Sequence, residues 1–315
     1  MRCLITGGAG FLGSWVAEQA AGEGDQVTVL DDFSEGKLKN IEHLRSAPKF
    51  KVIEGDVRRS SDVREPMRSV EVCFHLAAKV FVDESLRNPG LYKRVNVDGT
   101  LNLLEAARRF DVKMIFVSTC LIYDMTRDEP ISEEHELKPS SPYAASKIAA
   151  ESFVQAFHHA YGLPVVTLRP FNSYGPRQSF GAYGGVIARF IYKVLRNEPI
   201  PIYGDGSQTR DFLYAADCAD ALIAAAKSRA AVGKVLNIGS GTDIQITDLA
   251  EAILSLIPGK SRPVHVPHPH PQSEIMKLLC DYSKAKKVLD WEPKFTLKEG
   301  LRETIKWLRT EQSRA

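Results

Sequence analysis

The sequence predicts an α/β fold, in which a doubly wound parallel sheet is joined to a smaller carboxyl-terminal α/β domain. Three observations lead to this prediction. The first half of the 315-residue chain alternates short β-branched runs with helical patterns, which is typical of βαβ units and a parallel sheet covered on both faces. A glycine-rich turn joins the first expected strand to the first expected helix. The second half breaks this alternation and is richer in Pro and Gly.

The expected elements follow in order along the chain. Strands are expected at Arg2–Thr6, Gln26–Leu30, Lys51–Ile53, Val72–His75, Lys113–Ser118 and Val165–Arg169. Helices are expected between them at Leu12–Gly22, Ser60–Ser69, Leu86–Arg109 and Pro142–Tyr161. The shorter helical patterns of the second half lie at Val186–Arg196, Ala216–Ser228, Ile246–Leu256 and Leu297–Arg309.

The glycine-rich turn runs from Gly7 to Gly13, directly after the first strand. Gly7 permits the tight turn, Gly10 lets backbone amides approach a pyrophosphate, and Gly13 allows the helix to pack closely on the strand. The positive end of the helix dipole favours the pyrophosphate, so we expect cofactor contacts from the glycines and from Phe11 and Leu12. This turn makes the predicted sheet Rossmann-like.

Acidic residues follow the second and third strands. Asp31 and Asp32 stand about 20 residues after the glycine turn, where a carboxylate accepts hydrogen bonds from a ribose diol and repels a 2′-phosphate. We therefore predict NAD as the cofactor, with Asp31 as the better candidate because it follows the strand directly. Asp56 and Val57 follow the third strand and are expected near the adenine, although a loop-capping role for Asp56 is equally compatible with the pattern.

A soft domain boundary is expected near residue 170. Residues 1–170 would form the NAD-binding domain and residues 171–315 a substrate-binding domain. Lys234–Ile238 has the pattern of a buried strand, so we expect about 215–240 to return to the first domain.

Composition excludes several classes of protein. The net charge is +2 with 25% charged residues, which gives no basic footprint for nucleic acid. No apolar run approaches the length of a membrane span and the chain begins directly with a strand-like run, so we expect neither a transmembrane span nor a signal peptide. The five cysteines are scattered, without disulfide or metal-ligand spacing. We expect a cytoplasmic protein with reduced thiols.

Tyr143 and Lys147 form the pair with the clearest chemistry. On a helix, positions i and i+4 lie one above the other, so a phenol would stand beside an ammonium. A nearby positive charge favours the phenolate and lowers the pKa of a tyrosine toward the range of a general base. The pair alone is a weak signal because Tyr-x-x-x-Lys arises often by chance.

Together these motifs resemble the extended short-chain dehydrogenase/reductases that act on nucleotide sugars, the NAD-dependent epimerase/dehydratase family. The resemblance covers nearly the whole chain. Besides the glycine turn and the Tyr143/Lys147 pair, it rests on His75-Leu-Ala-Ala78, Asn96-Val-Asp-Gly-Thr100, Ser118-Thr119, Leu168-Arg-Pro-Phe-Asn172, Gly204-Asp-Gly-Ser-Gln-Thr-Arg210-Asp211, Asn237-Ile-Gly-Ser-Gly241 and Trp291-Glu-Pro-Lys294.

The resemblance implies a role for each matching residue. It makes Tyr143 the catalytic base, Thr119 the hydroxyl beside the sugar 4-OH, and Lys147 the residue that holds the nicotinamide ribose. Further cofactor contacts are implied at Leu76, Ala77, Ala78 and Asn96. Substrate contacts are implied at Asn172 and Arg210 for the diphosphate and at Tyr203 for the nucleoside. It also implies a homodimer through the helices at Leu86–Arg109 and Pro142–Tyr161.

The residues after Thr119 discriminate between the reactions of the family. The 4,6-dehydratases carry Asp and Glu there, as acid and base, and the decarboxylases of UDP-glucuronate carry a Glu. This chain has Cys120 and Leu121, and Leu121 cannot remove a C5 proton. The sequence therefore looks most like a 4-epimerase acting on a UDP-hexose or UDP-N-acetylhexosamine, with Cys120 as a packing residue. A dehydratase or related lyase with a displaced acid is the alternative, and a non-catalytic NAD(H)-binding regulator a remote one.

Two features depart from the usual 4-epimerase pattern. Asp124 stands where the family usually has Gly, and no Arg lies between Arg262 and Arg302 to supply a second contact to the diphosphate. His268, His270 and Lys277 are the available substitutes. The alternation of His265, His268 and His270 with Pro lacks a partner carboxylate motif, so we expect no metal.

Overall fold

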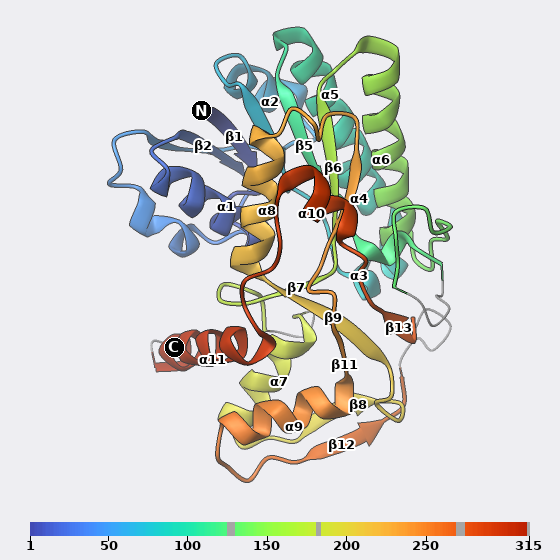
Figure 1. Ribbon diagram of the computed structural model, residues 1–315. Helices are drawn as coiled ribbons and strands as arrows, with labels where there is room; N and C mark the ends of the chain where they lie inside the picture. Colours follow the sequence, from blue (N-terminus) through green and yellow to red (C-terminus); the bar gives the residue numbers. More distant parts are fainter. Residues whose placement is uncertain (125–129, 181–183, 269–274, 314–315) are drawn as a thin grey trace.

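The computed structural model describes residues 1–124, 130–180, 184–268 and 275–313. Its centre is a parallel sheet of seven strands in the order β10-β6-β5-β4-β1-β2-β3 (Figure 1). The strands are β1 (Arg2–Thr6), β2 (Gln26–Asp31), β3 (Phe50–Glu54), β4 (Val72–His75), β5 (Lys113–Val117), β6 (Val165–Pro170) and β10 (Val235–Ile238). This arrangement confirms the predicted α/β fold. The late strand β10 pairs with β6 at the sheet edge, as the pattern at Lys234–Ile238 led us to expect.

Helices cover both faces of the sheet. Successive strand side chains point to opposite faces, and the buried residues separate accordingly into two apolar clusters. One face packs against α1 (Phe11–Gly22) and α8 (Ala215–Lys227). The other packs against α2 (Ser60–Met67), α5 (Gly99–Phe110) and α6 (Pro142–Tyr161). Burial on both faces explains why the strands read as almost continuous apolar runs.

The helix predicted over Leu86–Arg109 is wrong as a single element. The chain instead forms α3 (Val82–Arg87), α4 (Pro89–Tyr92), a π-helical turn η3 (Lys93–Asp98) and then α5. Pro89 starts a new helix because it has no N–H to donate, and the Asn88 side chain caps this start by accepting from the Leu91 amide. The π-helical turn places Asn96 beneath the loop that follows β4, as described below.

The second half of the chain forms a smaller unit below the sheet in Figure 1. Its strands are β7 (Asn172–Tyr174), β8 (Ile200–Tyr203), β9 (Thr209–Tyr214), β11 (Asp243–Gln245), β12 (Pro263–Val266) and β13 (Lys277–Leu278). Its helices are α7 (Val186–Leu195), α9 (Ile246–Leu256) and α11 (Leu297–Ser313), and α10 (Ser283–Leu289) lies nearer the sheet. Short 3₁₀ turns are η1 (Leu38–Asn40), η2 (Glu42–Leu44) and η4 (Cys120–Ile122). In the described part of the chain, no helix is both long enough and apolar enough to cross a membrane.

A buried polar network ties α6 to the sheet. Arg169 on β6 forms an ion pair with Glu151 on α6, and both side chains are buried. The Arg169 guanidinium also donates to the Tyr123 hydroxyl at 2.7 Å, and that hydroxyl donates to Asn237 Oδ1 at 2.6 Å. Every member of the network therefore has a partner, which is the condition under which buried charge is tolerated.

We expect Arg169→Met to destabilise the fold by roughly 3–5 kcal/mol, because it leaves the Glu151 carboxylate buried without a counter-charge. Equilibrium denaturation measures the loss. The double variant Arg169→Met/Glu151→Leu removes both charges and should recover part of it. A single variant as stable as the wild type would contradict this account of the network.

Candidate active site

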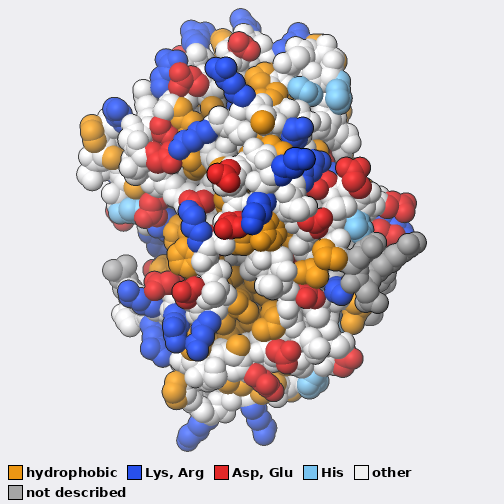
Figure 2. Space-filling view, viewed as in Figure 1, with side chains coloured by type: hydrophobic (Ala, Val, Ile, Leu, Met, Phe, Trp, Pro, Cys, Tyr) orange, Lys and Arg blue, Asp and Glu red, His pale blue; other side chains and the backbone are white. Residues whose placement is uncertain are grey.

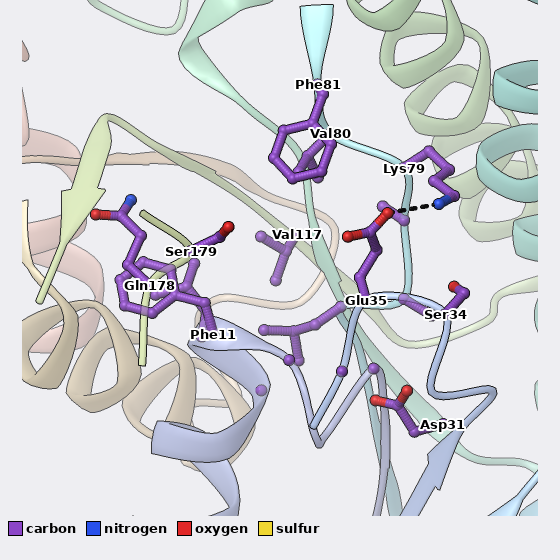
Figure 3. A pocket seen from close by; sticks show the side chains of 18 of the residues that line it. Phe11, Asp31, Ser34, Glu35, Lys79, Val80, Phe81, Val117, Gln178 and Ser179 are labelled. Carbon is purple, nitrogen blue, oxygen red and sulfur yellow. Dashed lines mark hydrogen bonds and ion pairs between the residues drawn. The ribbon is translucent and has the colours of Figure 1, made fainter. Parts of the chain in front are cut away.

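A cavity of about 930 Å³ lies over the carboxyl ends of the central strands (Figure 3). The segments after β1, β2, β3, β4 and β5 all contribute to its wall, as do β7 and α11 from the second half of the chain. Parallel strands bring their carboxyl ends to one edge, and ligands bind there in open α/β sheets. Most of the residues singled out in the sequence line this cavity: Gly7, Gly10, Phe11, Leu12, Asp31, Asp32, Asp56, Val57, Leu76, Ala77, Ala78, Thr119, Tyr143, Lys147 and Asn172.

The glycine turn is packed so closely that side chains are excluded. Gly7 has a φ of 70°, a conformation that glycine adopts without strain. A Cβ on Gly13 would lie 2.1 Å from the Gly7 carbonyl oxygen, and one on Gly7 would lie 2.7 Å from the Ala77 backbone nitrogen. The turn is therefore a bare backbone cradle at the start of α1, the arrangement that accepts a pyrophosphate.

The Asp31 carboxylate lies beside the glycine turn and accepts a hydrogen bond from its backbone. Its Oδ2 accepts from the Ala9 amide and its Oδ1 from the Phe33 amide, each at 2.9 Å. Burial raises the pKa of this carboxyl, and the two amide hydrogen bonds oppose the rise. Each carboxylate oxygen keeps a further lone pair for a ribose hydroxyl. Asp32 is more exposed and accepts from the Ser34 amide at 2.9 Å.

The Asp56 carboxylate accepts hydrogen bonds from the nearby Arg58 side chain. The Arg58 guanidinium donates to both of its oxygens, with Nε at 2.9 and 2.8 Å, and this hydrogen bonding lowers the pKa of the Asp56 carboxyl. Asn96 does not line the cavity. Its buried amide instead accepts from the Lys79 amide at 2.8 Å and donates to Ser146 Oγ at 2.9 Å, so it fastens the loop after β4 to α6.

Thr119, Cys120 and Tyr143 all line the cavity, and Thr119 and Cys120 lie near enough to Tyr143 to affect its pKa. Ser141 caps the start of α6 by accepting from the Ala144 amide at 3.2 Å, and Tyr143 stands in the first turn of that helix. Burial raises the pKa of Tyr143 to about 12, while a hydrogen bond from the Thr119 hydroxyl opposes the rise and the nearby Cys120 adds to it. The Tyr143 side chain is 6% exposed.

The Lys147 ammonium is bound at the end of β5. Its ammonium donates to the Val117 carbonyl oxygen at 2.6 Å and lies 4.5 Å from the centroid of the Phe116 ring. Burial lowers the pKa of Lys147 to about 8, and the Glu151 carboxylate one helical turn later opposes this shift. In this arrangement the interactions that move the pKa of Tyr143 are burial, Thr119 and Cys120. The lowering of that pKa by Lys147 remains a prediction.

Of the three residues expected to bind the substrate, one lines the cavity and two lie outside its lining. Asn172 lines the cavity and its amide donates to the Asp211 carbonyl oxygen at 3.1 Å. Arg210 lies outside the lining, close enough to Cys120 for its charge to lower the thiol pKa. Tyr203 also lies outside it, where its hydroxyl accepts from Arg189 at 3.3 Å and its ring meets His268 edge-on.

Several lining residues carried no signal in the sequence. Figure 3 shows Glu35, from the loop after β2, joined to Lys79, from the loop after β4, and the ion pair measures 2.7 Å. Trp307 and Glu311 reach the cavity from α11, where Glu311 pairs with Lys39. These ion pairs join segments that are far apart in the chain, so no local sequence pattern could predict them.

No cluster of three or more His, Cys, Asp or Glu side chains suited to a metal occurs among the described residues. His270 lies outside the described residues. The five cysteines are all free and buried.

The fold and the cavity together define a dinucleotide-dependent enzyme of the extended short-chain dehydrogenase/reductase type. The family model described as GDP-mannose 4,6 dehydratase matches residues 4–304. The chain belongs to this family, whose members are NAD-dependent nucleotide-sugar epimerases, dehydratases and decarboxylases.

Three similar proteins illustrate the range of the family. A UDP-N-acetyl-alpha-D-glucosaminuronate decarboxylase of Bacillus cytotoxicus is 37% identical, over 98% of this chain and 98% of that protein. The X-ray structure of Pal from Bacillus thuringiensis is 44% identical with a TM-score of 0.95, covering 99% and 100% of the two chains. UDP-glucuronic acid 4-epimerase from Bacillus cereus, solved with UDP-glucuronic acid and NAD, is 29% identical with a TM-score of 0.93, covering 99% and 98%.

NAD is the cofactor. The glycine cradle, which has no room for a Cβ at Gly7 or Gly13, fits its pyrophosphate, and the Asp31 carboxylate fits an unphosphorylated ribose diol.

We expect Gly13→Ala to weaken NAD binding by at least about tenfold, or ~1.4 kcal/mol, because the added methyl group must displace the Gly7 carbonyl. Titration of NAD measures the change. Gly22→Ala is the matched control on the same helix, since a Cβ there meets nothing within 4 Å. Equal NAD affinity in the two variants would contradict the assignment of the cradle.

Proposed function

We propose that this chain is an NAD-dependent nucleotide-sugar 4-epimerase that works through a transient 4-keto sugar, with UDP-glucose or UDP-N-acetylglucosamine as substrate. One observation carries the proposal. The carboxylates among the described lining residues belong to Asp31, Asp32, Glu35, Asp56 and Glu311. Asp31 ends β2, and the others follow β2 or β3 or lie on α11. The residues that follow Thr119 in the wall are Cys120 and the apolar Leu121. This wall supplies no carboxylate to remove a C5 proton, and a 4-epimerase needs none.

The chemistry then rests on Thr119, Tyr143 and Lys147 in the cavity wall. NAD, held by the glycine cradle and Asp31, would supply the acceptor for the C4 hydride and the donor for its return to the other face of the ketone. Tyr143 takes the proton of the 4-hydroxyl as general base and gives it back as general acid. The Thr119 hydroxyl orients the Tyr143 phenol oxygen and the 4-hydroxyl oxygen of the sugar. Burial disfavours the Tyr143 phenolate, so we propose that the positive nicotinamide ring and Lys147 provide the charge that makes deprotonation possible.

The substrate side is assigned by resemblance. Asn172, in the cavity wall, supports a contact to the diphosphate. Arg210 would join it because its planar fork suits phosphate oxygens. Tyr203 is retained as a nucleoside contact. A dehydratase would need an acid and a base where this chain has Cys120 and Leu121. A non-catalytic NAD(H)-binding regulator has less support, because Thr119, Tyr143 and Lys147 all line one cavity.

We also propose a homodimer formed through α5 and α6, which lie side by side in Figure 1. The outer face of α6 exposes two large apolar rings: Phe153 is 41% exposed and Tyr161 is 55% exposed. Pairing with a second copy would bury both of them. The buried free cysteines are consistent with the reducing cytoplasm as the compartment.

We expect Tyr143→Phe to bind NAD normally and to lower turnover by roughly 10²–10⁴-fold, the scale of general acid–base catalysis. A product-resolved assay with UDP-glucose and UDP-N-acetylglucosamine measures it. The wild type should yield the C4 epimer with unchanged mass.

Tyr161→Phe is the control for that experiment, because it makes the same change at the other end of the same helix, outside the cavity lining. Loss of water from the substrate would indicate a dehydratase. Near-normal turnover of Tyr143→Phe would refute the role of the phenol.

For the dimer, Phe153→Arg should produce a monomer, because two copies of the charge would be buried at the shared face. Light scattering after gel filtration measures the mass. Met276→Arg places the same charge on another exposed apolar residue, in the second half of the chain, and should leave the mass unchanged. Equal masses for both variants would exclude α6 as the interface.

A further inference from the structure

His75 is a buried histidine that the proposed reaction does not use. It ends β4 and is 2% exposed, and its register partners in the sheet are Thr6 of β1 and Phe116 of β5. Both ring nitrogens have a hydroxyl partner: Nδ1 lies 2.8 Å from Thr6 Oγ1, and Nε2 lies 2.9 Å from Thr100 Oγ1. The imidazole therefore connects β1, which leads into the glycine turn, with α5.

The direction of each of these hydrogen bonds follows from the other partners of the two hydroxyls. The Thr100 hydroxyl has one proton, which it donates to the Asn96 carbonyl oxygen at 2.6 Å. It can therefore only accept from His75, so Nε2 of the imidazole carries a proton. The Thr6 hydroxyl accepts from the Ala77 amide at 3.4 Å and has Nδ1 of His75 as the acceptor for its own proton. Donors and acceptors match throughout when His75 is the neutral Nε2–H tautomer.

The surroundings of the ring also favour its neutral form. Burial lowers the pKa of His75 to about 3, and the charge of Lys147 adds to this shift. The Lys147 ammonium lies 4.5 Å from the centroid of the Phe116 ring, and the centroid of that ring lies 5.8 Å from that of His75. Because both groups contact the same aromatic ring, a charged His75 would stand close to the Lys147 ammonium.

The hydrogen bonds continue from Asn96 to the helix that carries the catalytic tyrosine. The Asn96 amide donates to Ser146 Oγ at 2.9 Å, and that hydroxyl donates to the Tyr143 carbonyl oxygen at 2.7 Å. We call this series the His75 network, and all of its members are buried: Thr6, His75, Thr100, Asn96 and Ser146. It begins at the residue before Gly7 and ends at the backbone of Tyr143.

The two ends of the His75 network carry the two groups that a reaction at C4 must align. The glycine turn at one end holds the cofactor, and Tyr143 at the other end meets the 4-hydroxyl of the sugar. These groups belong to α1 and α6, which are far apart in the chain. A misplacement of about 1 Å between reacting groups can lower a rate by about 10²-fold, so a fixed polar connection between the two elements matters for turnover.

We propose that His75 is a positioning residue which, as the neutral Nε2–H tautomer, fixes the cofactor turn relative to Tyr143. It is not among the residues that line the cavity, and it acts through Thr6 on one side and Thr100 on the other. The effect on turnover rests on the proposed reaction at C4, whereas the tautomer can be measured without any substrate.

The first test observes the tautomer in the full-length protein with NAD bound. Long-range nitrogen–proton NMR spectra of protein labelled with ¹⁵N-histidine distinguish the two neutral tautomers from the imidazolium. The wild type should show one histidine that stays the Nε2–H tautomer across the pH range in which an exposed histidine loses its charge. The loss of this signal in His75→Asn assigns it. An Nδ1–H tautomer or an imidazolium at His75 would overturn the proposal.

The second test breaks the network at Thr100 without removing the imidazole. Thr100→Val keeps the shape of the side chain but leaves the His75 Nε2–H without its acceptor, and Thr100→Ser keeps the hydroxyl. Thr100→Val should lower kcat roughly 10- to 100-fold with KM and NAD affinity unchanged, because the cradle itself is intact. Thr100→Ser should restore most of the loss. The assay resolves the products of UDP-glucose and UDP-N-acetylglucosamine.

His75→Asn should reproduce the effect of Thr100→Val, because the shorter amide can still accept from Thr6 but cannot reach Thr100. Its matched control is His158→Asn, which removes another hydrogen-bonded imidazole. His158 Nδ1 lies 2.9 Å from the Leu163 carbonyl oxygen, on α6 and outside the cavity lining. This control should keep the wild-type kcat.

Wild-type kcat in Thr100→Val, or no rescue by Thr100→Ser, would overturn the positioning role. A fall of NAD affinity and melting temperature in parallel with kcat would also overturn it, because the network would then only stabilise the fold. If the wild type converts neither nucleotide sugar, the proposed reaction at C4 is refuted and the positioning role falls with it, whichever tautomer the NMR spectra show.

Discussion

The parallel register of the seven strands is the constraint on which the rest of the molecule depends. Because β1, β2, β3, β4 and β5 all run in the same direction, the segments that follow them leave the sheet at a single edge. The glycine turn, Asp31, Asp56, the loop after β4 and Thr119 are distant in sequence and become neighbours only through this register. A slip of one residue in any strand would exchange the side chains of its two buried faces and would also carry its loop away from the cavity. The stability of the sheet and the geometry of the site are thus set by the same pairing.

The second half of the chain packs against α1 next to this edge. Trp15 on α1 donates to the Pro176 carbonyl oxygen at 3.2 Å, and Gln19 on the same helix donates to the Ala216 carbonyl oxygen at 3.1 Å. Arg177 lies over the Trp15 ring, 4.8 Å from its centroid. Charged side chains of both signs are spread over the face seen in Figure 2, with hydrophobic side chains gathered near its middle. The helix that carries the glycine cradle is therefore also a major support for the segments after β6 that complete the cavity.

The sequence predicted what depends on local patterns. The predicted strands of the central sheet were accurate to a residue or two, because burial on both faces leaves an apolar run. Residues of the glycine turn, Asp31, Thr119 and Tyr143 all line the cavity. It could not show which distant partners a side chain binds. Asn96 matches a cofactor motif but binds the loop at Lys79 and α6. Lys147 has the spacing to meet Tyr143 yet donates to Val117. The helical pattern across Leu86–Arg109 continues through Pro89 and the π-helical turn, because apolar periodicity does not register a change in backbone hydrogen bonding.

Asp31 shows how tightly one side chain can link binding and architecture. Its two oxygens hold the amides of Ala9, within the glycine turn, and Phe33, in the loop after β2, while the same carboxylate faces the ribose site. A replacement that admits a 2′-phosphate would also release both loops. The preference for one dinucleotide over its phosphorylated relative is thus not an independent trait that drift can adjust. A chain that changed its cofactor would first need another way to hold the turn.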